Sequence, residues 1–147
     1  MGKYLVVANQ TLGGDQLMDE VRQRIAATTS SFYVLVPNTP LPESTGPVPS
    51  AVAASSAADA EHRGTLRAQA RLHQALGRIR AEGAEARGAL GDPDPLTAVG
   101  DMLAEENFDE IIISTLPGGL SRWLGMDLPH RAERRFKLPV TTITAKA

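Results

Sequence analysis

The sequence predicts a single α/β domain in which a doubly wound, mostly parallel β-sheet carries helices on both faces. Five short candidate strands, most of them apolar and rich in β-branched residues, recur along the 147-residue chain and alternate with segments of helical periodicity. Continuous apolar runs of this kind are typical of strands that are buried on both faces. Their alternation with helices predicts parallel strands joined by helical crossovers. A chain of this length can bury its own core, so residues 1–147 are taken as one domain.

The composition limits the classes of protein and partner. Hydrophobic residues make up 42% of the chain, charged residues 22%, and the formal net charge is −2, so no overall positive field favours nucleic acid or an anionic membrane. The absence of cysteine excludes disulfides, thiolate zinc sites, iron–sulfur clusters and a cysteine nucleophile. No apolar run approaches the ~20 residues that span a bilayer, and residues 1–10 lack a signal-peptide pattern. We therefore expect a soluble, cytoplasmic protein with no nucleic-acid or membrane partner.

The first two strands and the helix between them are predicted from apolar spacing. Residues 4–8 (YLVVA) and 32–36 (FYVLV) are the first two buried strands. Between them, Leu17, Val21 and Ile25 recur every four residues with charged residues on the other faces. That spacing predicts an amphipathic helix against the sheet.

An unusual segment follows the second strand. Residues 38–58 hold one charged residue, Glu43, and four of the ten prolines, with Ser, Thr, Gly and Ala between them. Proline removes backbone donors and few large side chains are present to bury, so we expect a flexible insertion on the surface. From about residue 60 a long helix is predicted, which ends at Gly83.

The remaining elements follow in the same alternating order. Residues 84–91 are the weakest strand pattern and are placed at a sheet edge. In residues 92–95 (DPDP), an Asp can accept from the first free N–H groups and a Pro suits the first turn, which predicts a helix start. Residues 111–113 (III) are the fourth strand, and the last strand covers residues 139–144, after a short helix and a basic segment.

The chain resembles the universal stress protein family over nearly its whole length apart from residues 38–58. The motifs that carry the resemblance are residues 4–9 (YLVVAN), 91–93 (GDP), 108–113 (FDEIII), 118–124 (GGLSRWL) and 139–141 (PVT). The resemblance implies a sheet in the order 3-2-1-4-5. It also implies a role in stress response and the pairing of two subunits through their last strands.

Nucleotide-binding members of this family carry Gly-x2-Gly-x9-Gly-(Ser/Thr) after the fourth strand, where glycines let backbone N–H groups approach phosphates. In this chain Ile113 and Leu116 stand at the first two glycine positions, and Met126 and Asp127 at the final pair. The acidic residue that ends the first strand in nucleotide binders is Asn9. Two like charges about 4 Å apart repel by about 1 kcal/mol even in bulk water, so Asp127 opposes a phosphate. ATP or AMP is therefore disfavoured as a cofactor, and no other cofactor is implied.

Polar residues nevertheless follow the first and fourth strands, where a ligand sits in sheets of this kind. They suit a small polar ligand, with Arg122 as an anion partner; alternatively, they cap strand ends and helix starts. The candidate ligand-binding residues are Asn9, Gln10, Thr11, Val36, Ser114, Thr115, Gly118, Gly119, Ser121, Arg122 and Asp127.

Catalytic and metal-binding patterns are absent from the sequence. The three histidines are scattered without a metal-ligand spacing, and neither a P-loop nor Gly-x-Ser-x-Gly occurs. Residues 130–137 carry four fixed positive charges and one negative charge, which suits either phosphate or nucleic acid, or the solvated face of a final helix. We interpret the segment as a solvated helix, and we assign no catalytic residue and no metal site.

These observations favour a noncatalytic, dimeric regulatory or small-ligand-sensing protein. One alternative is an adenine-nucleotide binder with an altered phosphate loop and at most slow hydrolysis. Another is a protein-interaction module that uses residues 38–58. The expected dimer interface is the last strand, which is β-branched and has no charge before Lys146. Its residues are Val140, Thr141, Thr142, Ile143 and Thr144.

Overall fold

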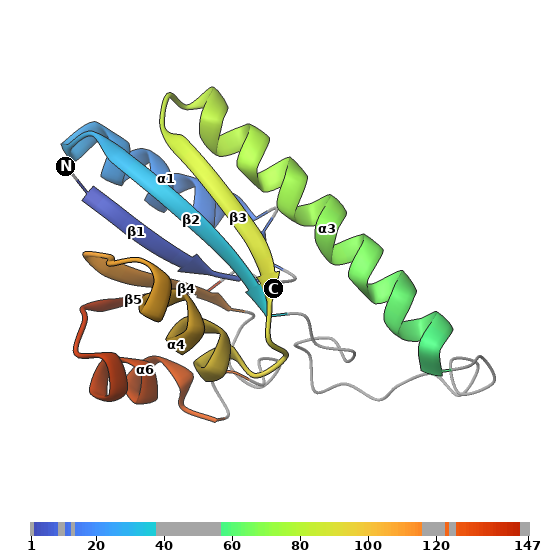
Figure 1. Cartoon of the computed structure of the whole chain (residues 1–147). Coiled ribbons are helices and arrows are strands. Elements are labelled where there is room, and N and C mark those ends of the chain that lie inside the picture. Colours follow the sequence, from blue (N-terminus) through green and yellow to red (C-terminus); the bar gives the residue numbers. More distant parts are fainter. Residues whose placement is uncertain are drawn as a thin grey trace.

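The computed structural model describes residues 2–8, 11, 12, 14–37, 57–115, 123 and 126–144, and for residues 57–64 only the helical backbone. The described strands form one five-stranded sheet in the order β3-β2-β1-β4-β5, and every neighbouring pair is parallel (Figure 1). This confirms the predicted fold class and the order 3-2-1-4-5. The strands are β1 (Gly2–Val7), β2 (Ser30–Pro37), β3 (Glu85–Gly91), β4 (Glu110–Thr115) and β5 (Val140–Thr144).

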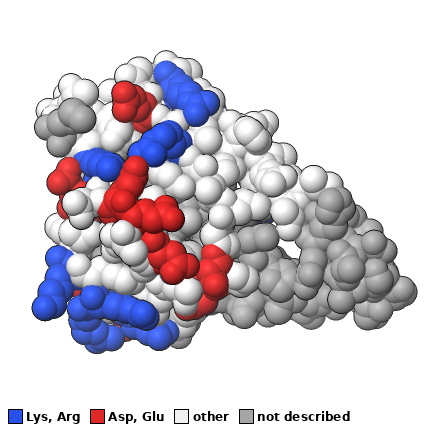
Figure 2. Space-filling view, viewed as in Figure 1, with Lys and Arg blue, Asp and Glu red and all other residues white. Residues whose placement is uncertain are grey.

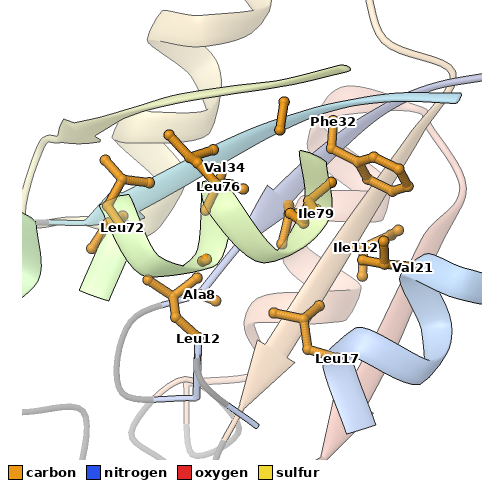
Figure 3. Packing of buried hydrophobic residues seen from close by; sticks show 14 of the residues in the cluster. Ala8, Leu12, Leu17, Val21, Phe32, Val34, Leu72, Leu76, Ile79 and Ile112 are labelled. Carbon is orange, nitrogen blue, oxygen red and sulfur yellow. The ribbon is translucent and has the colours of Figure 1, made fainter. Parts of the chain in front are cut away.

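Helices cover both faces of the sheet. On one face, α1 and α3 enclose a core cluster that includes Val34, Leu72 and Ile112 (Figure 3). On the other face, α4 and α6 enclose a second cluster that includes Leu5, Ile113 and Trp123. The central strands are therefore buried from both sides, which explains their continuous apolar sequence. The helices are α1 (Asp15–Ala27), α3 (Ala57–Ala81), α4 (Pro95–Glu105) and α6 (Leu128–Phe136).

The start of α4 has the capping chemistry that its sequence predicts. Asp94 is the N-cap, and its side chain accepts hydrogen bonds from the backbone N–H of Thr97 at 3.2 Å and from the Thr97 hydroxyl at 2.7 Å. Pro95 occupies the first turn, and Asp92 accepts from the Asp94 N–H at 2.9 Å. Gly83, after α3, has φ +98°, a left-handed conformation that glycine adopts without strain.

Several boundaries differ from the sequence prediction by a few residues; β2, for example, begins at Ser30 rather than at residue 32. The helix expected from about residue 60 begins at Ala57, so the last two residues of the predicted 38–58 insertion belong to α3. Residues 38–56 lie outside the described residues. The first strand begins at Gly2 rather than at residue 4, because Gly2 and Lys3 pair with Ser30 and Ser31 of β2. The Asp109 N–H also donates to the Lys3 carbonyl at 2.8 Å.

An ion-pair network joins three elements at the amino ends of the strands. Arg24 of α1 contacts Glu20 of the same helix and Glu110 of β4, both at 2.8 Å. Its guanidinium also donates to the Thr141 hydroxyl of β5 at 3.2 Å, and that hydroxyl is bonded to Glu110. These groups are partly buried, and they attach the edge strand β5 to α1.

Candidate functional site

The candidate site lies where the order of the sheet reverses. The chain passes from β1 to β2 on one side, whereas β4 pairs with β1 on the other side, and Val7 is opposite Ile113 in that pairing. In parallel sheets, ligands bind beyond the carboxyl ends of the strands at such a switch point. The residues that follow β1 and those that end β4 therefore face the same space.

Thr11 and Ser114, two of the candidate ligand-binding residues, meet at this point. The Thr11 hydroxyl donates to the Ser114 carbonyl at 3.1 Å, and the two hydroxyl oxygens lie 2.7 Å apart. Thr11 is 4% exposed and Ser114 1% exposed. This pair connects the loop after β1 to the end of β4 through buried hydrogen bonds, which are stronger away from water.

Thr115 differs from Thr11 and Ser114 in the hydrogen bonding of its hydroxyl. The residue is the last of β4, its relative exposure is 0%, and its Oγ1 has no hydrogen-bond partner among the described residues. A buried hydroxyl without a partner costs about 1–3 kcal/mol, and such groups are few in native proteins. Thr115 is therefore a buried donor and acceptor position at the carboxyl end of β4 whose partner does not lie among the described residues.

Two other candidates are described, and they differ in character. Val36, near the end of β2, is fully buried in the cluster beneath α1 and α3, so its side chain packs in the core. Asp127 precedes α6 in a left-handed conformation, φ 56°, and its carboxylate lies 2.8 Å from Nδ1 of His130. The side chain of Asp127 makes no cap hydrogen bond to the helix.

The remaining candidates for ligand binding lie outside the described residues, so the structure neither joins nor separates them. They are Asn9, Gln10, Gly118, Gly119, Ser121 and Arg122.

A cationic feature near this end of the sheet was not singled out from the sequence. Arg78 of α3 lies 4.0 Å from the carboxylate of Asp15, the first residue of α1. Its predecessors Arg67 and Arg71 occupy the same side of α3 by helical spacing. Burial, together with the neighbouring charge of Arg67, lowers the pKa of the Arg71 guanidinium. The spacing of these arginines in the sequence places them on one side of the helix. The sequence alone does not predict which part of the protein that side faces.

The basic segment of residues 130–137 forms the solvated outer face of α6, in line with its sequence interpretation. Ala132 and Leu128 are buried, whereas Arg131, Arg134 and Arg135 are exposed. Figure 2 shows basic side chains gathered at α6 and acidic side chains in a band across the middle of the same face of the molecule.

No group of three or more His, Asp or Glu side chains in the described part of the chain is placed to hold a metal ion. None of the helices found there combines the length and the hydropathy that a membrane span requires.

Comparison with known proteins supports the fold. No protein-family model matches the chain, and no curated protein sequence matches it. A universal stress protein from Archaeoglobus fulgidus is 18% identical, with a TM-score of 0.62 over 97% of this chain and 93% of that chain. A universal stress protein family protein from Arabidopsis thaliana with AMP bound is 14% identical, with a TM-score of 0.65 over 100% of this chain and 94% of that chain. A universal stress protein in complex with cAMP is 20% identical, with a TM-score of 0.53 over 99% and 98%. The chain therefore has the fold of the universal stress proteins.

Proposed function

We propose that this chain is a noncatalytic cytoplasmic protein that binds a small polar ligand at the switch point and acts as a homodimeric regulatory or sensing module in stress response. The observation that carries the proposal is the group of buried hydroxyls at the ends of β1 and β4. Thr11 and Ser114 satisfy each other, whereas Thr115 has no partner among the described residues. A ligand with one hydrogen-bonding group at this position would satisfy Thr115.

An adenine nucleotide is the second candidate ligand. Structural neighbours with the same fold were solved with AMP or cAMP bound. Thr115 suits a polar group of such a ligand. The carboxylate of Asp127 opposes a phosphate at the start of α6, which favours an uncharged polar ligand there.

Replacement of Thr115 tests the site. Thr115→Val keeps the shape and removes the buried hydroxyl, so the ligand-free protein should be as stable as the wild type or more stable. Thermal-shift measurements would use ATP, AMP, cyclic AMP and a set of small polar metabolites. A ligand at a hundredfold excess over its Kd stabilises the native state by about 2.7 kcal/mol, which raises the Tm. Thr115→Val should lose this ligand-induced rise in Tm.

The matched control is Thr142→Val, the same chemical change at an exposed position of β5. It should keep the ligand shift of the wild type. If Thr115→Val also keeps the full shift, or if no compound stabilises the wild type, the proposed ligand site is wrong.

The dimer is proposed through β5, which lies at the end of the sheet. The N–H of Ile111 donates to the carbonyl of Pro139 at 2.9 Å, so the backbone groups of Pro139 face β4. Successive residues of a parallel strand direct these groups to alternate sides. Thr141 and Ile143 therefore face β4, whereas the N–H of Thr142 faces the outer side, where an antiparallel copy would pair with it.

Thr142→Pro removes an outward donor without removing a hydrogen bond to β4. Light scattering should show a dimeric wild type and a monomeric Thr142→Pro variant with unchanged far-ultraviolet circular dichroism. Thr142→Val keeps the N–H and should remain dimeric. A monomeric wild type at micromolar concentration would overturn the proposed dimer.

A further inference from the structure

The strand β3 forms one end of the sheet, opposite the end formed by β5 (Figure 1). In a parallel sheet the N–H and C=O groups of one residue point to the same side of the strand, and those of the next residue point to the other side. The N–H of Ala8 donates to the carbonyl of Leu35 at 3.3 Å, so Leu35 faces β1 and Val34 faces β3. Val34 is the register partner of Gly88, and it bonds to the residues on either side of that partner, so the backbone groups of Gly88 point away from the sheet.

The side chain of Arg80 lies on this outer edge. Ala86 and Leu90, two residues before and after Gly88, direct their backbone groups outward in the same way. Arg80 is in the last turn of α3, and its Nε and Nη2 donate to the carbonyl of Ala86 at 3.1 and 2.7 Å. Neighbouring strands lie only about 4.7–4.9 Å apart, so the guanidinium occupies the place where a further strand would donate its own N–H groups.

The edge that Arg80 leaves open is short. β3 has seven residues, and beyond Ala86 its outward backbone groups are those of Gly88 and Leu90. Arg87 points instead to the C-terminal end of α4, where it donates to a carboxylate at 2.9 Å. A short edge with a fixed charge across one end gives another strand little to pair with, which is how native proteins protect exposed edges.

The opposite edge, β5, has no such cover in the described part of the chain. Val140, Thr142 and Thr144 direct their backbone groups outward, by the same alternation that places Pro139 against β4. Among the described residues, the side-chain hydrogen bonds that reach β5 go to the hydroxyl of Thr141, so they leave the outward backbone groups uncovered. The two edges of the sheet are therefore unequal.

Unequal edges decide how far association through strands can proceed. Two copies paired through β5 about a two-fold axis form one continuous sheet with a β3 strand at each end. If those ends accepted strands, further dimers would add to them in an open series. Because both ends are covered, association stops at the dimer.

We propose that Arg80 closes the outer edge of β3 to strand addition, so that copies of this chain pair through β5 alone. The occupant that it excludes is the β3 edge of a second copy. The role of β5 in this inference rests on the proposed function, whereas the closure of β3 stands on the contact of Arg80 with Ala86.

Replacement of Arg80 tests the closure. Arg80→Ala removes the cover and places a good helix former in the last turn of α3. Light scattering and sedimentation velocity would follow the mass of each protein as its concentration rises. The wild type should stay a dimer, whereas the mass of Arg80→Ala should rise to at least that of two dimers, with unchanged far-ultraviolet circular dichroism. A variant that keeps the wild-type mass at every concentration would overturn the inference.

Amide hydrogen exchange would locate the new contact. As Arg80→Ala associates, exchange at Gly88 and Leu90 should slow, because their outward N–H groups become bonded between two β3 edges. Association without that slowing would place the contact elsewhere and count against the inference.

Arg67→Ala is the matched control, because it removes the same charge from an exposed position of the same helix. It should keep the mass of the wild type. Equal association in this control would reduce the effect to net charge and overturn the inference.

Thr142→Pro separates this inference from the proposed dimer. That variant should be monomeric, and Thr142→Pro with Arg80→Ala should form dimers in which exchange at Leu90 is slowed. If the wild type is itself a monomer, the proposed β5 dimer is wrong and Arg80→Ala still decides the inference. Association through β3 would then support the closure by Arg80, and a monomeric Arg80→Ala would overturn it.

Discussion

Gly88, in the middle of β3, lets α3 approach the sheet more closely than any larger residue would. A Cβ atom added there would lie 2.5 Å from the carbonyl oxygen of Val34 and 2.8 Å from Cδ1 of Leu72. Val34 is the register partner of Gly88 on β2, so its oxygen cannot move without disturbing the pairing of the two strands. Gly88→Ala should therefore destabilise the protein, although alanine reduces the entropy of the unfolded chain.

The magnitude follows from these two opposing effects. Overpacking costs about 1–3 kcal/mol, and the entropic gain of Gly→Ala returns about 0.4–1 kcal/mol, so a net loss of about 1–2 kcal/mol is expected. For a chain of this size that loss lowers the Tm by about 2–8 °C. Urea unfolding followed by the fluorescence of Trp123, the one tryptophan and a buried one, would measure it at fixed protein concentration.

Gly77, on the outer side of α3, is the matched control. A Cβ atom there meets no described atom within 4 Å, and alanine is the better helix former by about 1 kcal/mol. Gly77→Ala should raise the unfolding midpoint while Gly88→Ala lowers it. An equal or higher midpoint in Gly88→Ala would refute the close approach of α3 to β3.

Two further predictions concern α4 and its surroundings. Asp94→Ala should cost about 1 kcal/mol of unfolding free energy, because it removes the N-cap of α4, whereas Asp101→Ala, at an exposed position of the same helix, should change it by less than about 0.5 kcal/mol. The hydrogen bond from Arg87 lowers the pKa of Glu106 below its ordinary 4.5. This pair therefore stabilises the fold fully above pH 4.5, and its contribution is lost as the pH falls through the lowered pKa of Glu106. Arg87→Gln should flatten the acid side of a plot of stability against pH, and an unchanged plot would contradict the pairing.

The sheet could be predicted from the sequence because its apolar runs have one structural explanation. Ile111, Ile112 and Ile113 are at most 1% exposed, so β4 is buried on both faces. Three consecutive apolar residues indicate such a strand directly, because successive side chains point to opposite faces of the sheet. The ends of the strands were less clear. The extension of β1 to Gly2 depends on its pairing with Ser30 and Ser31 of β2, and Asp109, more than one hundred residues away, also accepts a hydrogen bond from the Lys3 N–H; the residues around Gly2 give no local sign of either contact.

The contact between Thr11 and Ser114 follows from strand order, because Thr11 comes after β1 and Ser114 lies near the end of β4, the parallel neighbour of β1. The sequence could not predict that the Thr115 hydroxyl has no hydrogen-bond partner among the described residues, since that depends on what surrounds one atom.

Two positions that differ from the phosphate-loop pattern of the nucleotide-binding universal stress proteins have a structural role in this chain. Ile113, at the first glycine position, is 1% exposed and packs in the cluster beneath α4 and α6, so its side chain fills the core. Asp127 brings a carboxylate to the N-terminal end of α6, the end at which the helix dipole would otherwise attract an anion. A phosphate at the start of α6 would therefore meet a like charge, whereas an uncharged polar group there would not.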